Sequence, residues 1–163
     1  MIYRPGTHAD LEQLRQLAVE SWSRFKTVLT EDNFQKLFNN ISSTNTYAEL
    51  LNTSFCYVCM DHEQVVGMAF LVPSGKATDI YDAAWCSIRF VTVHPGYNGQ
   101  GIGKKLTQLC IDKAKQTGEK IIALHTSEFM SNARHIYEGL GFSVLKEIAP
   151  RFDKKYWLYT MVI

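Results

Sequence analysis

The sequence contains no long hydrophobic run and almost no excess of charge of either sign. None of its apolar stretches approaches the roughly 18 residues that a membrane-spanning helix needs, and no basic-then-apolar leader stands at Met1. Its 17 Lys and Arg balance 16 Asp and Glu, which gives no electrostatic reason to expect nucleic acid or an acidic membrane as a partner. We therefore expect a cytoplasmic protein, with residues 1–163 forming one domain.

Cysteine is scarce as well, with four in the chain. Cys56 and Cys59 form a C-x-x-C, but they lie inside FCYVCM, an apolar run typical of a strand. Strand residues three apart point to opposite faces of a sheet. We therefore expect buried thiols that pack as small hydrophobic groups, and no disulfide framework or metal site.

The chain also lacks the two common glycine-rich nucleotide motifs. A Walker A loop requires a glycine where Asn98 stands and a Ser or Thr where Lys105 stands. The dinucleotide fingerprint G-x-G-x-x-G fails at its third glycine, because Lys104 occupies that position. ATP-type and Rossmann-type phosphate sites are therefore not indicated.

A strand, a glycine loop and a helix do follow one another between Phe90 and Leu106. The β-branched run after Phe90 is typical of a strand, which Pro95 should end because it has no backbone N–H. Three alternating glycines, Gly99, Gly101 and Gly103, then lead into an amphipathic helix. The first N–H groups of a helix lack partners and favour an anion. On these residues alone, a phosphate site and an ordinary tight turn both remain open.

Two segments resemble the GNAT superfamily of N-acetyltransferases. NGQGIG, at residues 98–103, resembles its acyl-CoA pyrophosphate loop, Gln/Arg-x-x-Gly-x-Gly/Ala, with Asn98 replacing Gln or Arg. ARHIYEGLGF, at residues 133–142, resembles its A-x-x-x-Y-E-x-x-G-F element. The resemblance implies acetyl-CoA as co-substrate, with the pyrophosphate bound by Asn98, Gly99, Gln100, Gly101, Ile102, Gly103 and Lys104.

The order of apolar periodicities predicts an α/β (α+β) fold with a largely antiparallel sheet and one parallel strand pair, flanked by helices. Strands are predicted at residues 1–4, 55–60, 65–72, 85–93, 121–125, 142–148 and 156–163, and helices at 11–22, from 30, at 47–51, from 102 and at 131–140. Residues 39–45 read as a loop. The resemblance implies that strands 85–93 and 121–125 splay apart, that pantetheine lies between them beside Val91 and Val93, and that a bulge lies near Val91 and Thr92.

The resemblance also implies that Tyr137 protonates the leaving thiolate, although its ring is equally suited to packing on the sheet. A backbone N–H near Val93 is expected to hold the carbonyl oxygen. Many relatives carry Asn seven residues before the Tyr; Met130 stands there in this chain. Asn132, two residues later, is therefore the expected cofactor contact on this helix.

A general base is harder to assign, because residues 85–89 contain no carboxylate and Ser87 occupies the place where relatives often carry Glu. Proton removal by water is one possibility. The other candidates are four side chains: Asp79, Asp82, His125 and Glu128. Of these, His125 is expected to titrate near neutrality. Trp22, Phe25 and Trp85 are expected to line an acceptor pocket or to pack in the core.

The expected function is transfer of an acetyl group from acetyl-CoA to a primary amine of a small molecule or peptide, by direct attack in a ternary complex. The alternative is an acyl-CoA-binding regulatory module without turnover. We expect a monomer, or a homodimer joined through sheet edges near the C-terminus.

Overall fold

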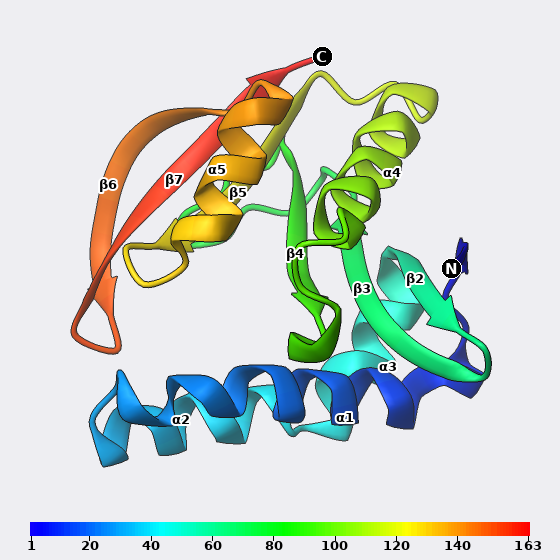
Figure 1. Cartoon of the computed structure of the whole chain (residues 1–163). Helices are drawn as coiled ribbons and strands as arrows, with labels where there is room; N and C mark the ends of the chain where they lie inside the picture. Colours follow the sequence, from blue (N-terminus) through cyan, green and yellow to red (C-terminus); the bar gives the residue numbers. More distant parts are fainter.

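In the computed structural model, which describes residues 1–163, all seven strands belong to one sheet in the order β1-β2-β3-β4-β5-β7-β6 (Figure 1). Their bounds are β1 Ile2–Pro5, β2 Phe55–Asp61, β3 Gln64–Val72, β4 Cys86–Val93, β5 Ile121–Ser127, β6 Ser143–Arg151 and β7 Lys154–Val162. Neighbouring strands are antiparallel except β4 and β5, which are parallel. The predicted mixed sheet with one parallel pair is confirmed.

Helices cover both faces of the sheet. The helices are α1 Leu11–Trp22, α2 Glu31–Ile41, α3 Thr44–Thr53, α4 Ile102–Gln116 and α5 Ser131–Leu140. The first three pack on one face and α4 and α5 on the other, so two apolar clusters lie on opposite sides of the strands (Figure 1). No helix combines the length and apolar character needed to cross a bilayer. Cys59 belongs to the α4 cluster and Cys56 to the α1 cluster, as the strand periodicity predicted.

The prediction of a loop at residues 39–45 is wrong. Helix α2 continues to Ile41, and α3 already begins at Thr44. Ile41 and Tyr47 are buried at 2% and 0% exposure, and the Tyr47 hydroxyl donates to the Ile41 carbonyl oxygen over 2.6 Å. The tertiary burial of these side chains outweighs the weak helix propensity of the Asn, Ser and Thr residues around them.

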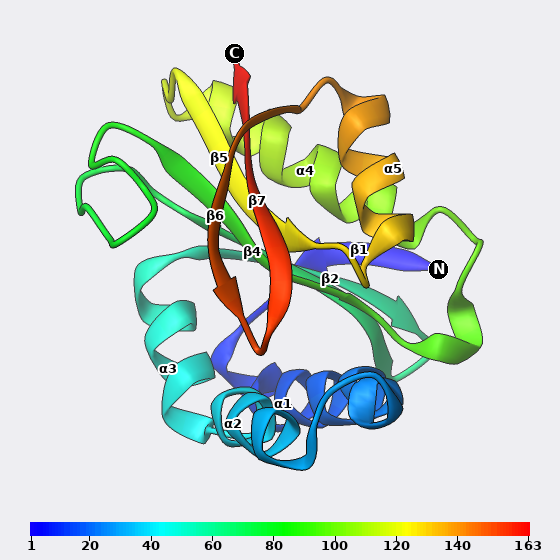
Figure 2. The same cartoon turned by 90° about the vertical axis from the view of Figure 1, so that its left-hand side faces the viewer.

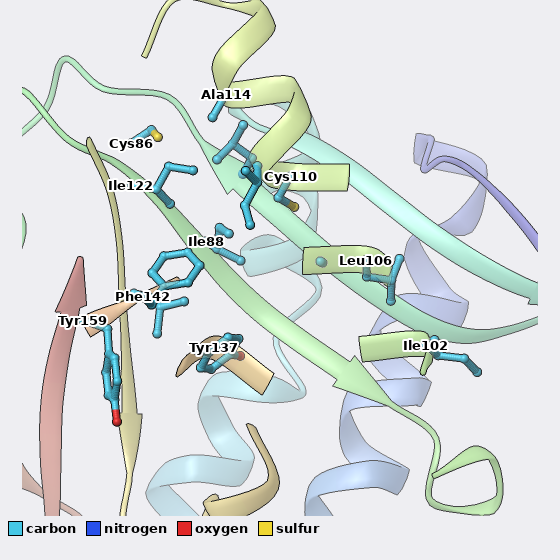
Figure 3. Packing of buried hydrophobic residues seen from close by; sticks show 14 of the residues in the cluster. Cys86, Ile88, Ile102, Leu106, Cys110, Ala114, Ile122, Tyr137, Phe142 and Tyr159 are labelled. Atoms are coloured by element: carbon cyan, nitrogen blue, oxygen red, sulfur yellow. The ribbon is translucent and has the colours of Figure 1, made fainter. Parts of the chain in front are cut away.

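Helix α4 begins very close to the sheet because β3 carries Gly67 beneath it. A Cβ at Gly67 would lie 2.7 Å from Ile102 Cγ2 and 3.0 Å from Leu106 Cδ1. Figure 3 shows Ile102, Leu106 and Cys110 along the face of α4 that is turned to the strands. The packing of α4 therefore fixes where the glycine loop before it sits.

Strands β4 and β5 pair over only two positions before they separate. Cys86 pairs with Ile122 and Ser87 with Ala123, and no pair follows. On its other side β4 bulges: the register with β3 shifts between Arg89 and Thr92, and Phe90 has φ 55°. The bulge lies at residues 90–91, about one residue before the predicted position. The β5-facing edge of β4 beyond Ser87 therefore has no strand partner.

The hairpin of β6 and β7 reaches from the sheet toward α2 (Figures 1 and 2). Both strands differ from the predicted ranges, and Asn33 of α2 donates through Nδ2 to Asp153 Oδ2 in the hairpin turn over 2.8 Å. Strand β6 forms one edge of the sheet, where Val144 and Leu145 are exposed. A homodimer contact at this edge stays a prediction.

Candidate active site

The glycine loop presents a continuous row of unpaired backbone donors. None of the N–H groups of residues 99–104 has an acceptor within the chain, and the first helical bond of α4 runs from Lys105 N to Gly101 O over 3.0 Å. Gly99 and Gly101 adopt φ of 79° and 76°, and a Cβ on either would meet nothing within 4 Å. Six backbone donors without partners thus lie together at the positive end of a helix, an arrangement that favours an anion.

This loop combines backbone donors with local positive charge. Asn98, Gln100 and Lys104 are exposed, whereas the Ile102 side chain is buried against the sheet. Ile102 can therefore contribute only its backbone to a ligand. Val93 lies close by: a Cβ on Gly103 would stand 3.6 Å from Val93 Cγ2.

A cavity of about 1190 Å³ opens where β4 and β5 separate. Five predicted site residues line it: Trp22, Asp79, Val91 on β4, His125 on β5 and Tyr137 on α5. The glycine loop, Val93 and Asn132 do not; Asn132 is exposed in the first turn of α5. The cavity continues between α2, α3, the loop after β3 and the turn of the β6–β7 hairpin.

Tyr137 is held in the core while its hydroxyl remains available. The side chain is 7% exposed and its ring packs edge-on against Phe142, with centroids 6.0 Å apart. Figure 3 places it beside β4, below Ile88. Its hydroxyl has no hydrogen-bond partner in the chain, yet it is not sealed from solvent. Burial raises the pKa of Tyr137 above that of a free phenol, so the group keeps its proton at neutral pH.

His125 lies in an aromatic cluster, and the prediction that it titrates near neutrality is wrong. Its ring stands between Tyr81 and Tyr156, and Nδ1 shares a short hydrogen bond with the Tyr81 hydroxyl. Burial, followed by the positive charges of Arg151 and Arg89, lowers the pKa of His125 to about 4. The imidazole is therefore neutral over the physiological range.

The other base candidates are engaged elsewhere. Asp79 lines the cavity but pairs with Arg151 over 3.3 Å. Asp82 accepts from the Ala84 backbone N–H over 2.8 Å, and Glu128 accepts from the Lys155 backbone N–H over 3.2 Å. Neither Asp82 nor Glu128 lines the cavity.

Of the three aromatic residues predicted for an acceptor pocket, only Trp22 lines the cavity. Phe25 is buried among the helices, 4.8 Å from the Phe129 ring centroid, and Trp85 packs beside the Tyr81 cluster. Aromatic spacing alone does not distinguish core from pocket, and here Phe25 is buried while Trp85 is partly buried against the core.

Sequence reasoning named Asp79 but missed the other charged residues that line the cavity. Arg89 lies on β4 and Arg151 at the end of β6, and four further residues of α2, α3 and the loop after β3 contribute polar groups: Lys36, Asn40, Glu49 and Lys76. A signal for Arg89 existed, because a charged residue inside an otherwise apolar strand needs a special environment. No comparable local signal marks Arg151.

Residues 11–142 match the sequence profile of the Acetyltransferase (GNAT) family, which is most of the chain. The chain belongs to the GNAT family of acetyltransferases. This GNAT chain is 32% identical over 88 residues to the Uncharacterized N-acetyltransferase YjgM of Escherichia coli, an alignment that covers 53% of this chain and 50% of YjgM. It is 31% identical over 119 residues to the Probable N-acetyltransferase camello of Xenopus laevis, covering 72% of this chain and 52% of camello.

The alignments thus span about half the length of these curated relatives. The fold is similar over nearly the full chain to the PaiA N-acetyltransferase of Thermoplasma acidophilum, solved in complex with coenzyme A. The TM-score is 0.81 at 16% identity, with 99% of this chain and 98% of PaiA covered. At that identity the likeness shows the GNAT fold alone.

Proposed function

We propose that this GNAT chain transfers an acetyl group from acetyl-CoA to a primary amine of a small molecule or peptide, by direct attack in a ternary complex. The observation that carries the proposal is the placement of Tyr137, whose hydroxyl is unpaired and whose residue lines the cavity where β4 and β5 separate. The relatives named as N-acetyltransferases support the reaction class, and coenzyme A in PaiA supports the co-substrate.

The residues present fit acetyl-CoA. The N–H groups of residues 99–104 offer donors for a pyrophosphate, with Lys104 adding a positive charge. The unpaired edge of β4, at Val91 and Val93, offers backbone groups for the amides of the pantetheine arm. Asn98 and Asn132, exposed on either side, are the proposed side-chain contacts. When bound, acetyl-CoA supplies an activated acetyl thioester.

Tyr137 is proposed as the general acid. Its raised pKa keeps the phenol protonated, so Oη can donate a proton to the sulfur that leaves. A backbone N–H of β4 near Val93 is the proposed donor to the carbonyl oxygen.

Removal of the amine proton is assigned to water rather than to a carboxylate. His125 remains a candidate because a neutral imidazole accepts a proton, but with a pKa near 4 it would hold that proton weakly.

The test is release of free CoA thiol from acetyl-CoA in the presence of a panel of primary amines. All four protein cysteines are buried, so a thiol reagent sees little background from the enzyme. We expect steady release that requires an amine. The lack of a carboxylate at Ser87 favours the alternative of a non-catalytic acyl-CoA-binding module, and tight binding without amine-dependent release would select that alternative.

A further inference from the structure

Arg89 is a guanidinium without a carboxylate partner inside the cavity. Its Nε donates to Ser87 Oγ over 3.0 Å, and its Cζ stands 5.0 Å from the centroid of the Tyr81 ring. These two contacts orient the side chain, but its terminal nitrogens make no hydrogen bond in the chain. The arginines that do form ion pairs are Arg4, Arg15 and Arg151. A half-buried, oriented and unsatisfied guanidinium is a ready donor to an anion.

Arg151 brings a second guanidinium to the same place from the β6–β7 hairpin. Its one carboxylate partner, Asp79, has a side chain that is 79% exposed, and such surface pairs are weak and easily exchanged. Arg89 and Arg151 both line the cavity together with His125, and, after burial, the charges of both lower the pKa of that imidazole.

The residues that line the cavity carry an excess of positive charge, like the two arginines. Its lining contains the cations Lys36, Lys76, Arg89 and Arg151, but as anions only Glu49 and Asp79. This local excess stands out in a chain whose net charge is +1. The cavity would repel an acceptor that is only a cation and would attract one that also carries a negative group.

We propose that Arg89 and Arg151 bind a carboxylate carried by the acceptor, so that the substrates are amino acids or other amines bearing a carboxylate. The proposal rests on the proposed function, because it assigns the acceptor of that reaction. The planar fork of a guanidinium matches a carboxylate in two hydrogen bonds, which would fix the orientation of the acceptor as well as hold it. Arg89, already oriented by Ser87 and Tyr81, is the main contact.

The experiment compares L-amino acids with their C-terminal amides, which differ only at the carboxylate. For each pair, kcat/KM is measured by thiol release, and binding to the protein saturated with CoA is measured by calorimetry. The wild-type protein should favour the acid. Arg89→Gln should lower kcat/KM and affinity for the acid by roughly 10- to 100-fold, as for loss of a charge-assisted hydrogen bond, and change those for the amide less than about threefold.

Arg151→Gln should also lower kcat/KM and affinity for the acid more than for the amide. Lys155 is an exposed cation of the same hairpin outside the cavity, so Lys155→Gln should change neither quantity. The ratio of acid to amide is the readout, since a general loss of folding or activity changes both alike. Equal use of acid and amide by the wild type, an equal loss for both in Arg89→Gln, or a matching loss of CoA affinity would each overturn the proposal. Acid-selective binding that Arg89→Gln abolishes, without acetyl transfer, would support the carboxylate site and refute the proposed function.

Discussion

The candidate site has a backbone end, the glycine loop before α4, and a side-chain end, the cavity that reaches α2 and α3. The two are built from different parts of the polypeptide. At the backbone end the proposed recognition groups are the N–H groups of residues 99–104, where Gly99 and Gly101 adopt positive φ. At the side-chain end they are side chains from separate elements, among them Arg89 and Arg151. A backbone site depends on local conformation, whereas a side-chain site depends on how distant segments meet. The first can be shared by many acetyltransferases, while the second can vary with the acceptor.

Tyr137 lies between the two ends, and its removal is expected to have the largest effect. Tyr137→Phe keeps the ring that packs on Phe142 and removes only the hydroxyl. The turnover number should fall by roughly 10²- to 10⁴-fold, the range for loss of a general acid, while stability and CoA affinity stay nearly constant. Tyr97→Phe, which removes a hydroxyl bonded to Asp61 outside the cavity, is the matched control. An unchanged turnover number at saturating acetyl-CoA, with chemistry rate-limiting, would remove Tyr137 from the mechanism.

The backbone end is tested most sharply at Gly103. Its φ is not positive, and a Cβ there would make only ordinary contacts with Ile136 and Val93, both at 3.6 Å. Gly103→Asp should therefore fold while placing a negative charge among the donors. Like charges brought together cost several kcal/mol, so CoA affinity should fall by roughly 10³-fold.

Gly103→Asn is the neutral control for that change and should lose much less affinity. Acceptor discrimination between acids and amides should survive in both variants at saturating acetyl-CoA, because the arginines are untouched. If folded Gly103→Asp binds CoA as tightly as the wild type, the loop is not the pyrophosphate site.

These two ends also differ in how far the sequence predicts them. The alternating glycines and Pro95 impose local backbone constraints, so the loop and the start of α4 could be located directly. Arg151 reaches the cavity only because the β6–β7 hairpin extends toward α2, a tertiary arrangement with no local pattern. The low pKa of His125 likewise arises from burial and from the charges of Arg151 and Arg89, groups that only the tertiary fold brings to it. The loop between α2 and α3 was predicted too long because the burial of Tyr47 overrides local propensity.

At the side-chain end, the environment of His125 predicts a pH dependence of stability. The unfolded chain has an ordinary His pKa of 6.5 and the folded chain one of about 4, so between these values the unfolded state binds more protons. Stability should therefore fall as the pH is lowered, by about 2 kcal/mol between pH 7.5 and pH 5. The low folded pKas of Asp10 and Glu12 lie below this window and do not contribute to it.

Urea denaturation of the wild type and of His125→Asn at both pH values measures this effect. Asn offers an oxygen near the position of Nδ1 for the Tyr81 hydroxyl, so the variant should fold and lose most of the pH dependence. If the stability of His125→Asn changes with pH as much as that of the wild type, groups other than His125 cause the pH dependence.

The smallest expected effect concerns the support of the backbone end, at Gly67. Gly67→Ala would press a methyl group against Ile102 Cγ2, 2.7 Å away, and against Leu106 Cδ1 at 3.0 Å. Overpacking of this kind typically costs about 1 kcal/mol or more. Because Ile102 is the first residue of α4, the shift should also move the N–H groups beside it and weaken CoA binding several-fold.

Gly139→Ala is the matched control. Gly139 lies in α5, a Cβ there would meet nothing within 4 Å, and alanine at this position should stabilise the helix by roughly 0.5–1 kcal/mol. Denaturation of both variants measures the effect on stability, and calorimetry with CoA measures the effect on cofactor binding. A Gly67→Ala protein as stable as the wild type, with unchanged CoA affinity, would mean that the close approach of α4 to β3 is not what holds the loop in place.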